Sequence, residues 1–198
     1  MIEYRNIQRF DDLEFGKYLN LKGYSHSFLK REVGGVSPEF TETDKVRLGK
    51  LVDGILTEPR SVDMKSNLYP AAKSIAYEIK TKFGTLIDKF EKQVSFSAEL
   101  EFSGFVMPTT CRLDFGVPNF AVIDLKVTYA SDVHALIKFM GYENQLWNYC
   151  RVYQVERQYI LIYSVPLRRS FFLDLGELPK RNAFWENKVL KFGNVLTR

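Results

Sequence analysis

Cysteine is scarce in this chain of 198 residues, which contains only Cys111 and Cys150. Two cysteines are too few for a disulfide framework, and they do not make a zinc site or an iron–sulfur cluster. The expected environment is therefore reducing, and the expected location is the cytoplasm. Long apolar runs are also lacking: no stretch of about 18 apolar residues occurs, and the residues after Met1 contain no apolar signal core. No membrane association is expected.

A strong excess of charge of either sign is absent as well. The net charge is +4 and the isoelectric point is about 8.9, so binding to a polyanion is permitted but not required. The share of charged residues, 26%, is ordinary for a globular protein. The length predicts one domain over residues 1–198, with 1–24 as an N-terminal extension, a core at about 25–175 and a C-terminal helix at 181–198.

Hydrophobic periodicity and turn residues divide the chain into helices and strands. Thr43 is suited to cap one helix and Pro59 to stop it, and a later helix is expected to bend at Gly141. The order of the segments predicts an α/β domain with a central mixed sheet of about five strands flanked by helices. Helices are expected at residues 11–19, 25–32, 44–58, 71–92, 132–153 and 181–191, and strands at 94–102, 111–117, 121–127, 157–164 and 171–175.

The stretch from 111 to 127 predicts a hairpin, because two β-rich segments flank the turn residues Pro118 and Asn119. If the hairpin is centred on Asn119, Asp114 lies opposite Asp124, and Arg112 lies opposite Lys126. Side chains alternate along a strand, so the other face of the hairpin is expected to be apolar. That apolar face would consist of Leu113, Phe115, Val117, Ile123, Leu125 and Val127.

Two directly opposed carboxylates repel one another, and a divalent cation between them would remove the repulsion. Mg²⁺ favours carboxylate ligands, and Lys126 points to the same side of its strand as Asp124, where it can face a phosphate. The pattern Asp114 … Asp124-Leu125-Lys126 thus fits metal-assisted attack on a phosphodiester. The alternative from spacing alone is a cluster of ion pairs on the surface beside a hairpin.

Further motifs follow in order along the chain. The segment Gln145-Leu-Trp-Asn-Tyr149 comes after the hairpin, and Leu48–Pro59 and Ser25–Lys30 precede it. Together with the aspartate and lysine pattern, they resemble the PD-(D/E)XK nuclease superfamily. The most similar branch is RecB-like and includes exodeoxyribonuclease VIII and phage recombination exonucleases. Two positions depart from that pattern: Asp53 stands where the branch has a histidine, and Leu113 stands where the name has a proline.

The resemblance implies a restriction-endonuclease-like fold and one or two Mg²⁺ or Mn²⁺ ions as cofactors. Asp114 and Asp124 would bind the metal, with the Leu125 carbonyl and Asp53 as further ligands. Lys126 would orient or activate the attacking water and stabilise charge on the phosphate. The resemblance also assigns Glu99 as an additional acidic group. Gln145 and Tyr149 would line the nucleic-acid groove, and Ser25 of the opening helix would be a further nucleic-acid-binding residue. Arg47, Lys50, Arg112 and Lys138 are candidate contacts to the DNA backbone, given the phosphates that such a substrate carries.

The implied activity is that of an exonuclease acting on double-strand DNA ends in recombination or repair, in a bacterial or phage-infected cell. The expected partner is DNA, as duplex ends or as a single strand. A homo-oligomeric ring around DNA is a further implication of the resemblance. Two alternatives stay open. One is a structure-specific or sequence-specific endonuclease, and the other is a nucleic-acid-binding scaffold that has the fold without catalysis.

Overall fold

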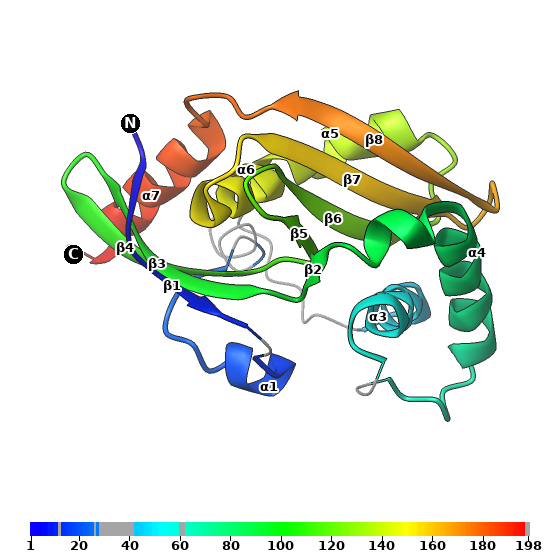
Figure 1. Ribbon diagram of the computed structural model, residues 1–198. Coiled ribbons are helices and arrows are strands. Elements are labelled where there is room, and N and C mark those ends of the chain that lie inside the picture. The colour runs from blue at the N-terminus through cyan, green and yellow to red at the C-terminus, as the bar shows by residue number, and fades with distance from the viewer. Residues whose placement is uncertain (12, 26, 28–41, 60–61, 197–198) are drawn as a thin grey trace.

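The computed structural model describes residues 1–198 except 12, 26, 28–41, 60–61 and 197–198. Two sheets and the helices around them make up the described part (Figure 1). The strands are β1 (Glu3–Phe10), β2 (Glu91–Lys92), β3 (Ser95–Phe102), β4 (Phe105–Arg112), β5 (Phe115–Val117), β6 (Ala121–Thr128), β7 (Arg157–Ser164) and β8 (Arg169–Glu177). The helices are α1 (Phe15–Tyr18), α3 (Asp44–Thr57), α4 (Tyr69–Ile87), α5 (Val133–Met140), α6 (Tyr142–Tyr153) and α7 (Ala183–Leu196).

The larger sheet has five strands in the order β2-β5-β6-β7-β8, which confirms the prediction of a mixed sheet of about five strands. Strands β6 and β7 are parallel, and the other neighbours in this sheet are antiparallel. A parallel pair needs a long crossover, and α5 and α6 supply it here. The fold is an α/β arrangement around an open mixed sheet.

Helices cover both faces of this sheet, because its central strands are apolar on both sides. Alternate residues of β7 show the division: Leu161 packs in one core with α3 and α4, whereas Ile160 and Ile162 pack in a second core with α5 and α6. In Figure 1, α3 and α4 lie at the lower right, and α5 and α6 lie behind the sheet. Strand β6 lies between the two cores, with Ile123 and Leu125 in the first and Val122 in the second.

The hairpin of β5 and β6 has the predicted register. Phe115 pairs with Ile123 and Val117 with Ala121, so the turn is centred on Asn119, which has a φ of 59°. The ladder ends at Phe115, however, because the chain passes from one sheet to the other at Leu113 and Asp114.

The prediction that Arg112 lies opposite Lys126 is therefore wrong. Arg112 is the last residue of β4 and pairs with Ser95 of β3. Leu113 likewise leaves the predicted apolar face and packs in the core beneath α5 and α6. Phe115, Ile123 and Leu125 do pack together in the core beneath α3 and α4.

The smaller sheet, in the order β1-β3-β4, contains two strands that the sequence pattern did not predict. Residues 3–10 were expected in an extension, but they form β1, which pairs with β3. Residues 105–112 were expected mainly as a turn, but they form β4. Pro108 lacks an N–H, and β4 accommodates it because β4 is an edge strand.

The helix boundaries follow local chemistry. Thr43 caps α3 by accepting a hydrogen bond from Val46 N at 3.4 Å, as predicted. Helix α4 ends at Ile87, five residues earlier than expected, and Glu91–Lys92 then pairs with β5. The helix expected at 132–153 is divided into α5 and α6 at Gly141, whose φ is 67°. The helix expected at 25–32 lies almost entirely outside the described residues.

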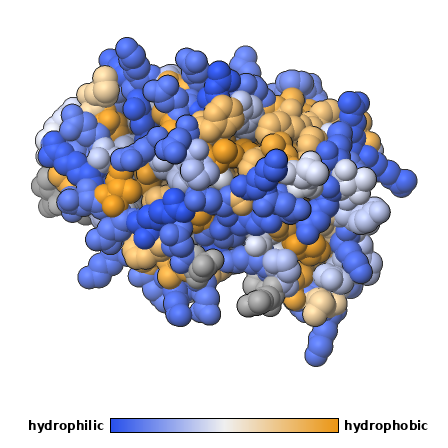
Figure 2. All heavy atoms as spheres, viewed as in Figure 1, coloured by the Kyte–Doolittle hydropathy of each residue, from blue (hydrophilic) through white to orange (hydrophobic). Residues whose placement is uncertain are grey.

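None of the helices in the described ranges has the length and apolar character that a membrane crossing requires. Hydrophilic side chains cover most of the face seen in Figure 2, with apolar patches between them, and the lower edge of this face is notched.

Candidate active site

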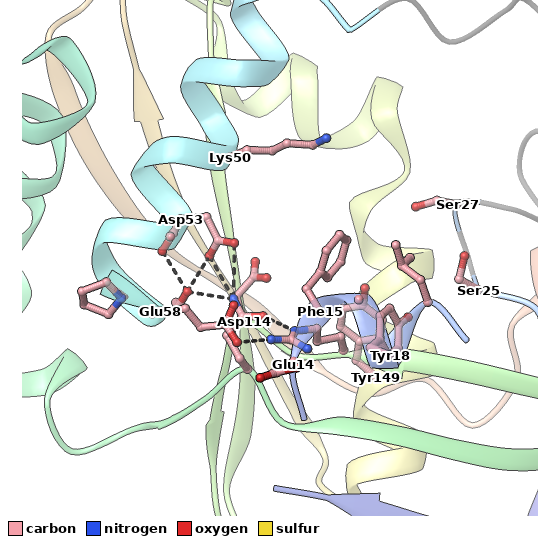
Figure 3. Close-up of a pocket in the computed structure, with 17 residues that line it drawn as sticks. Glu14, Phe15, Tyr18, Ser25, Ser27, Lys50, Asp53, Glu58, Asp114 and Tyr149 are labelled. Atoms are coloured by element: carbon pink, nitrogen blue, oxygen red, sulfur yellow. Dashed lines mark hydrogen bonds and ion pairs between the residues drawn. The ribbon is translucent and has the colours of Figure 1, made fainter. Parts of the chain in front are cut away.

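The three predicted aspartates come together from three elements. Asp53 lies on α3, Asp114 lies in the link between β4 and β5, and Asp124 lies within β6. A cavity of about 1090 Å³ is lined by Asp53 and Asp114, and an adjoining groove of about 600 Å³ is lined by the same two residues and by Leu125 and Lys126. Figure 3 shows the side chains of Asp53 and Asp114 pointing toward one another in the cavity.

Asp114 is attached to β6 by a backbone hydrogen bond. Leu125 N donates to Asp114 Oδ2 at 2.7 Å, so the link between the sheets is tied to the strand that carries Asp124. Burial raises the pKa of Asp114 well above its usual range, and the charges of Asp53 and Asp124 raise it further. Lys126 and the bond from Leu125 oppose that rise only in part.

Asp124 and Lys126 form an ion pair on one side of β6. Lys126 Nζ lies 2.6 Å from Asp124 Oδ2, and Asp124 is only 1% exposed. The two residues are i and i+2 on a strand, so their side chains share a face. Burial lowers the pKa of Lys126, but Asp124 and Asp114 together raise it by more, which keeps the ammonium charged. The same ammonium lies 5.4 Å from the centre of the Tyr142 ring.

Asp53 takes its orientation from Gln93 and Thr57. Gln93 Nε2 donates to Asp53 Oδ1 at 3.2 Å and to Oδ2 at 3.3 Å, and Thr57 Oγ1 donates to Oδ1 at 3.3 Å. Burial raises the pKa of Asp53 to about 6, and Lys126 and Thr57 counteract part of that rise. The three carboxylates thus lie within one another's electrostatic field, with Lys126 as the cation among them.

The chemistry of these groups fits a hard divalent cation. Carboxylate oxygens and a backbone carbonyl are the ligands that Mg²⁺ and Mn²⁺ prefer. Asp124 Oδ2 is buried and has the Lys126 ammonium beside it, but no aligned hydrogen bond. In the described ranges, no three His, Cys, Asp or Glu side chains are already gathered closely enough to hold a metal ion. In the structure, the Lys126 ammonium provides the positive charge beside Asp124 that a bound cation would otherwise provide.

The comparisons with known proteins concern the fold. No protein-family model and no curated protein matches the sequence. The structure is similar to a crystal structure from Eubacterium rectale named "Putative exonuclease", with a TM-score of 0.50 and 16% identity over 85% of this chain and 70% of that one. This likeness concerns the fold, and the open five-stranded mixed sheet with its helices is consistent with the restriction-endonuclease-like fold expected from the sequence. A phage-related exonuclease from Haemophilus somnus 129PT is also similar, with a TM-score of 0.38 and 15% identity over 94% of this chain and 92% of that one.

Several other predicted residues lie beside the aspartates in this fold. Gln145 Nε2 lies 3.5 Å from Asp124 Oδ1 and donates to Tyr149 Oη at 2.7 Å, so α6 contributes one wall of the site. Tyr149, Lys50 and Ser25 line the larger cavity. The Lys50 side chain extends from α3 toward Ser27 in Figure 3, and its ammonium lies 2.6 Å from Glu42 Oε1.

Four predicted residues have surroundings that differ from their expected roles. Glu99 is exposed on the smaller sheet, where its carboxylate accepts a hydrogen bond from Asn6 at 2.6 Å, and it lines neither the cavity nor the groove. Arg47 is paired with Asp44 at 3.1 Å. Arg112 is only 7% exposed and donates to Glu58, Gln93 and the Leu13 carbonyl, so its guanidinium is held inside the protein. Lys138 lies on α5, beside a different cavity.

The sequence pattern did not indicate Gln93, Thr57, Glu58 or Tyr142. Thr57 lies four residues after Asp53 on α3, so helical spacing was the signal that could have found it. Gln93 had no comparable signal, because it reaches Asp53 from 40 residues away. Gln93 reaches Asp53 only because the pairing of β2 and β3 with their neighbours places the residue between them beside α3.

Proposed function

We propose that this protein is a metal-dependent nuclease that hydrolyses DNA phosphodiester bonds, and that it acts as an exonuclease on double-strand ends. The observation that supports the proposal best is the ion pair of Asp124 with Lys126, next to Asp114 and in the field of Asp53. Buried like charges destabilise a fold unless a partner compensates them, so such a cluster is typical of a functional site.

Asp114, Asp124 and the Leu125 carbonyl would hold Mg²⁺ or Mn²⁺, with Asp53 as a further ligand. The bound cation would supply positive charge that stabilises the phosphate as negative charge develops on it. A cation held by Asp124 would take over the charge compensation that Lys126 now provides, and the Lys126 ammonium would then be available in the groove that Lys126 and Leu125 line.

Lys126 acts in this scheme as a hydrogen-bond donor. In the protein without metal, Asp124 and Asp114 raise the pKa of Lys126, so the ammonium is protonated there and is ready to donate. The ammonium can hold the attacking water by its oxygen or contact a non-bridging oxygen of the phosphate. Both contacts become stronger as negative charge develops.

DNA would approach through the cavity and the groove. Tyr149 offers an aromatic ring on the cavity wall, and Lys50 offers a cation that can exchange Glu42 for a phosphate. The name of the similar Eubacterium rectale structure is the reason for preferring an exonuclease to an endonuclease. A role in recombination or repair, a phage or bacterial cytoplasmic setting and a homo-oligomeric ring belong to the same proposal.

Incubation of linear and of covalently closed circular duplex DNA with the protein tests the proposal, with Mg²⁺, with Mn²⁺ and with EDTA. We expect the linear DNA to be degraded only when a divalent metal is present, and the circle to survive. Cutting of the circle would favour the endonuclease. DNA binding without cleavage under any metal would favour the scaffold and refute the proposed activity. The Asp124→Asn variant is the inactive control.

A further inference from the structure

Gln93 lies where the two sheets diverge, and its backbone is strained. It follows β2 directly, has a φ of 54° and is buried at 8% exposed. A left-handed conformation is unfavourable for a residue other than glycine, and it persists where surrounding contacts enforce it. The contacts of Gln93 therefore reveal what this conformation achieves.

Gln93 contacts both Asp53 and Asp114. Its backbone N–H donates to the Asp114 carbonyl at 3.2 Å, and its side-chain amide donates to both oxygens of Asp53 and to Thr57 Oγ1 at 2.9 Å. One residue thus joins the helix that carries Asp53 to the link that carries Asp114. In Figure 3, dashed lines run from the Asp53 side chain to neighbouring side chains of the cavity.

Arg112 determines which way the amide of Gln93 faces. A guanidinium has only donors, so Gln93 Oε1 must face Arg112 Nε, and the NH₂ group must face Asp53. Arg112 is itself fixed, because its other nitrogens donate to Glu58 and to the Leu13 carbonyl. The orientation of the Asp53 carboxylate is in this way transmitted from a buried arginine through Gln93.

We propose that Gln93 is a positioning residue that sets the distance and orientation of Asp53 relative to Asp114 for the divalent cation. The inference rests on the proposed function, since it assigns a task to Gln93 within that same site. Groups that orient metal ligands typically contribute a factor of 10–100 in metal affinity or activity. Gln93 does not touch the substrate or the metal in this assignment.

The test uses Gln93→Asn in the full chain and measures Mn²⁺ binding by electron paramagnetic resonance without DNA. Asparagine adopts the left-handed conformation more readily than glutamine, so the backbone tolerates this variant. Its side chain is one methylene shorter and cannot reach both Arg112 and Asp53. We expect the dissociation constant for Mn²⁺ to rise about 10-fold or more.

A double-mutant cycle separates positioning from a general structural effect. If Gln93 acts through Asp53, then Gln93→Asn combined with Asp53→Asn should bind Mn²⁺ no more weakly than Asp53→Asn alone. Gln158→Asn is the matched control: this buried glutamine lies on β7 and does not line the cavity or the groove, so Mn²⁺ binding should not change.

The outcomes are distinct. Equal Mn²⁺ affinity of Gln93→Asn and the wild type, or effects of the two substitutions that multiply in the double variant, would overturn the positioning role and leave the proposed nuclease standing. Absence of Mn²⁺ binding and of DNA cleavage by the wild type would overturn both. If Gln93→Asn fails to fold, Thr57→Val removes the hydroxyl that accepts from Gln93 Nε2 at 2.9 Å and so loosens the same side chain. It should raise the Mn²⁺ dissociation constant in the same direction, and an unchanged constant would overturn the positioning role.

Discussion

At the scale of single residues, Lys126 has two roles, one in stability and one in catalysis, and two measurements on one variant can distinguish them. It neutralises Asp124 when no metal is present, and in the proposed reaction it contacts the water or the phosphate. Breaking a buried ion pair by removal of one partner is strongly destabilising, because the other charge remains buried. A divalent cation at Asp124 would compensate that charge.

We predict that Lys126→Ala lowers DNA cleavage at least about 100-fold and still binds Mn²⁺. Without metal, its melting temperature should fall below that of the wild type, and Mg²⁺ should raise it by more than it raises the wild type. Scanning calorimetry with and without Mg²⁺, together with a cleavage assay, measures both effects. Lys73→Ala, an exposed position on α4, is the control and should change neither. Full activity of Lys126→Ala would refute the role assigned to it.

The pKa of Asp53 predicts how stability without metal depends on pH. The folded-state pKa is about 6, above the 3.8 of an ordinary aspartate, mainly because of burial. The folded protein therefore binds more protons than the unfolded chain between these values, and its stability falls as the pH rises through this window. The contribution is fully present below about pH 3.8 and is lost above about pH 6.

Melting temperatures in EDTA at pH 5 and pH 7.5 test this sign. Other groups titrate in the same range, so the informative quantity is the difference between the wild type and Asp53→Asn. We expect the wild type to lose several degrees more than the variant on going to pH 7.5, and Mg²⁺ to restore most of that loss. A variant that loses as much as the wild type would show that Asp53 does not carry the effect.

At the scale of elements, Gly141 is the residue that separates α5 from α6 and so directs Gln145 and Tyr149 into the site. It is the C-cap of α5 and the N-cap of α6, with a φ of 67°, where a Cβ atom is strained. A Cβ atom there would also lie 3.1 Å from Asn144 Nδ2, but that side chain can move. The backbone conformation is the main constraint.

We predict that Gly141→Ala lowers the free energy of unfolding by about 1 kcal/mol, measured by urea denaturation. Gly84→Ala is the matched control, because Gly84 lies inside α4 without a positive φ and has room for a Cβ atom. It should stabilise the protein by up to about 1 kcal/mol. The same sign of effect at both positions would contradict the assignment.

Local signals explain which elements could be predicted from the sequence. The Thr43 cap and the turn at Asn119 are determined by neighbouring residues, and both α3 and the register of β5 and β6 were predicted correctly. Strand β4 was missed because Pro108 indicates a turn, and only its partner β3 shows that it is an edge. Likewise, the aspartates belong to a recognisable pattern, whereas Gln93 acquires its role from Asp53 and Arg112, which lie far from it in the sequence.

At the scale of the whole molecule, Arg112 connects parts of the chain that the sheets would otherwise leave separate. From the end of β4 its guanidinium reaches Glu58 after α3, Gln93 between β2 and β3, and the Leu13 carbonyl near the N-terminus. The Phe15 and Tyr18 rings lie 5.6 and 5.9 Å from it. The smaller sheet, the N-terminal segment and α3 therefore meet at one buried cation.

We predict that Arg112→Lys lowers the free energy of unfolding by about 2–3 kcal/mol, although the charge is kept. An ammonium cannot reproduce the planar fork that serves these acceptors together, and buried groups left without a partner cost about 1–3 kcal/mol each. Arg157→Lys is the control, because Arg157 and Asp174 form a largely exposed pair at 3.6 Å, and this change should cost less than about 1 kcal/mol. Urea denaturation compares the two variants. Equal losses would mean that Arg112 does not join these segments, whereas a loss confined to Arg112→Lys would show that global stability depends on the buried side chain that also orients Gln93.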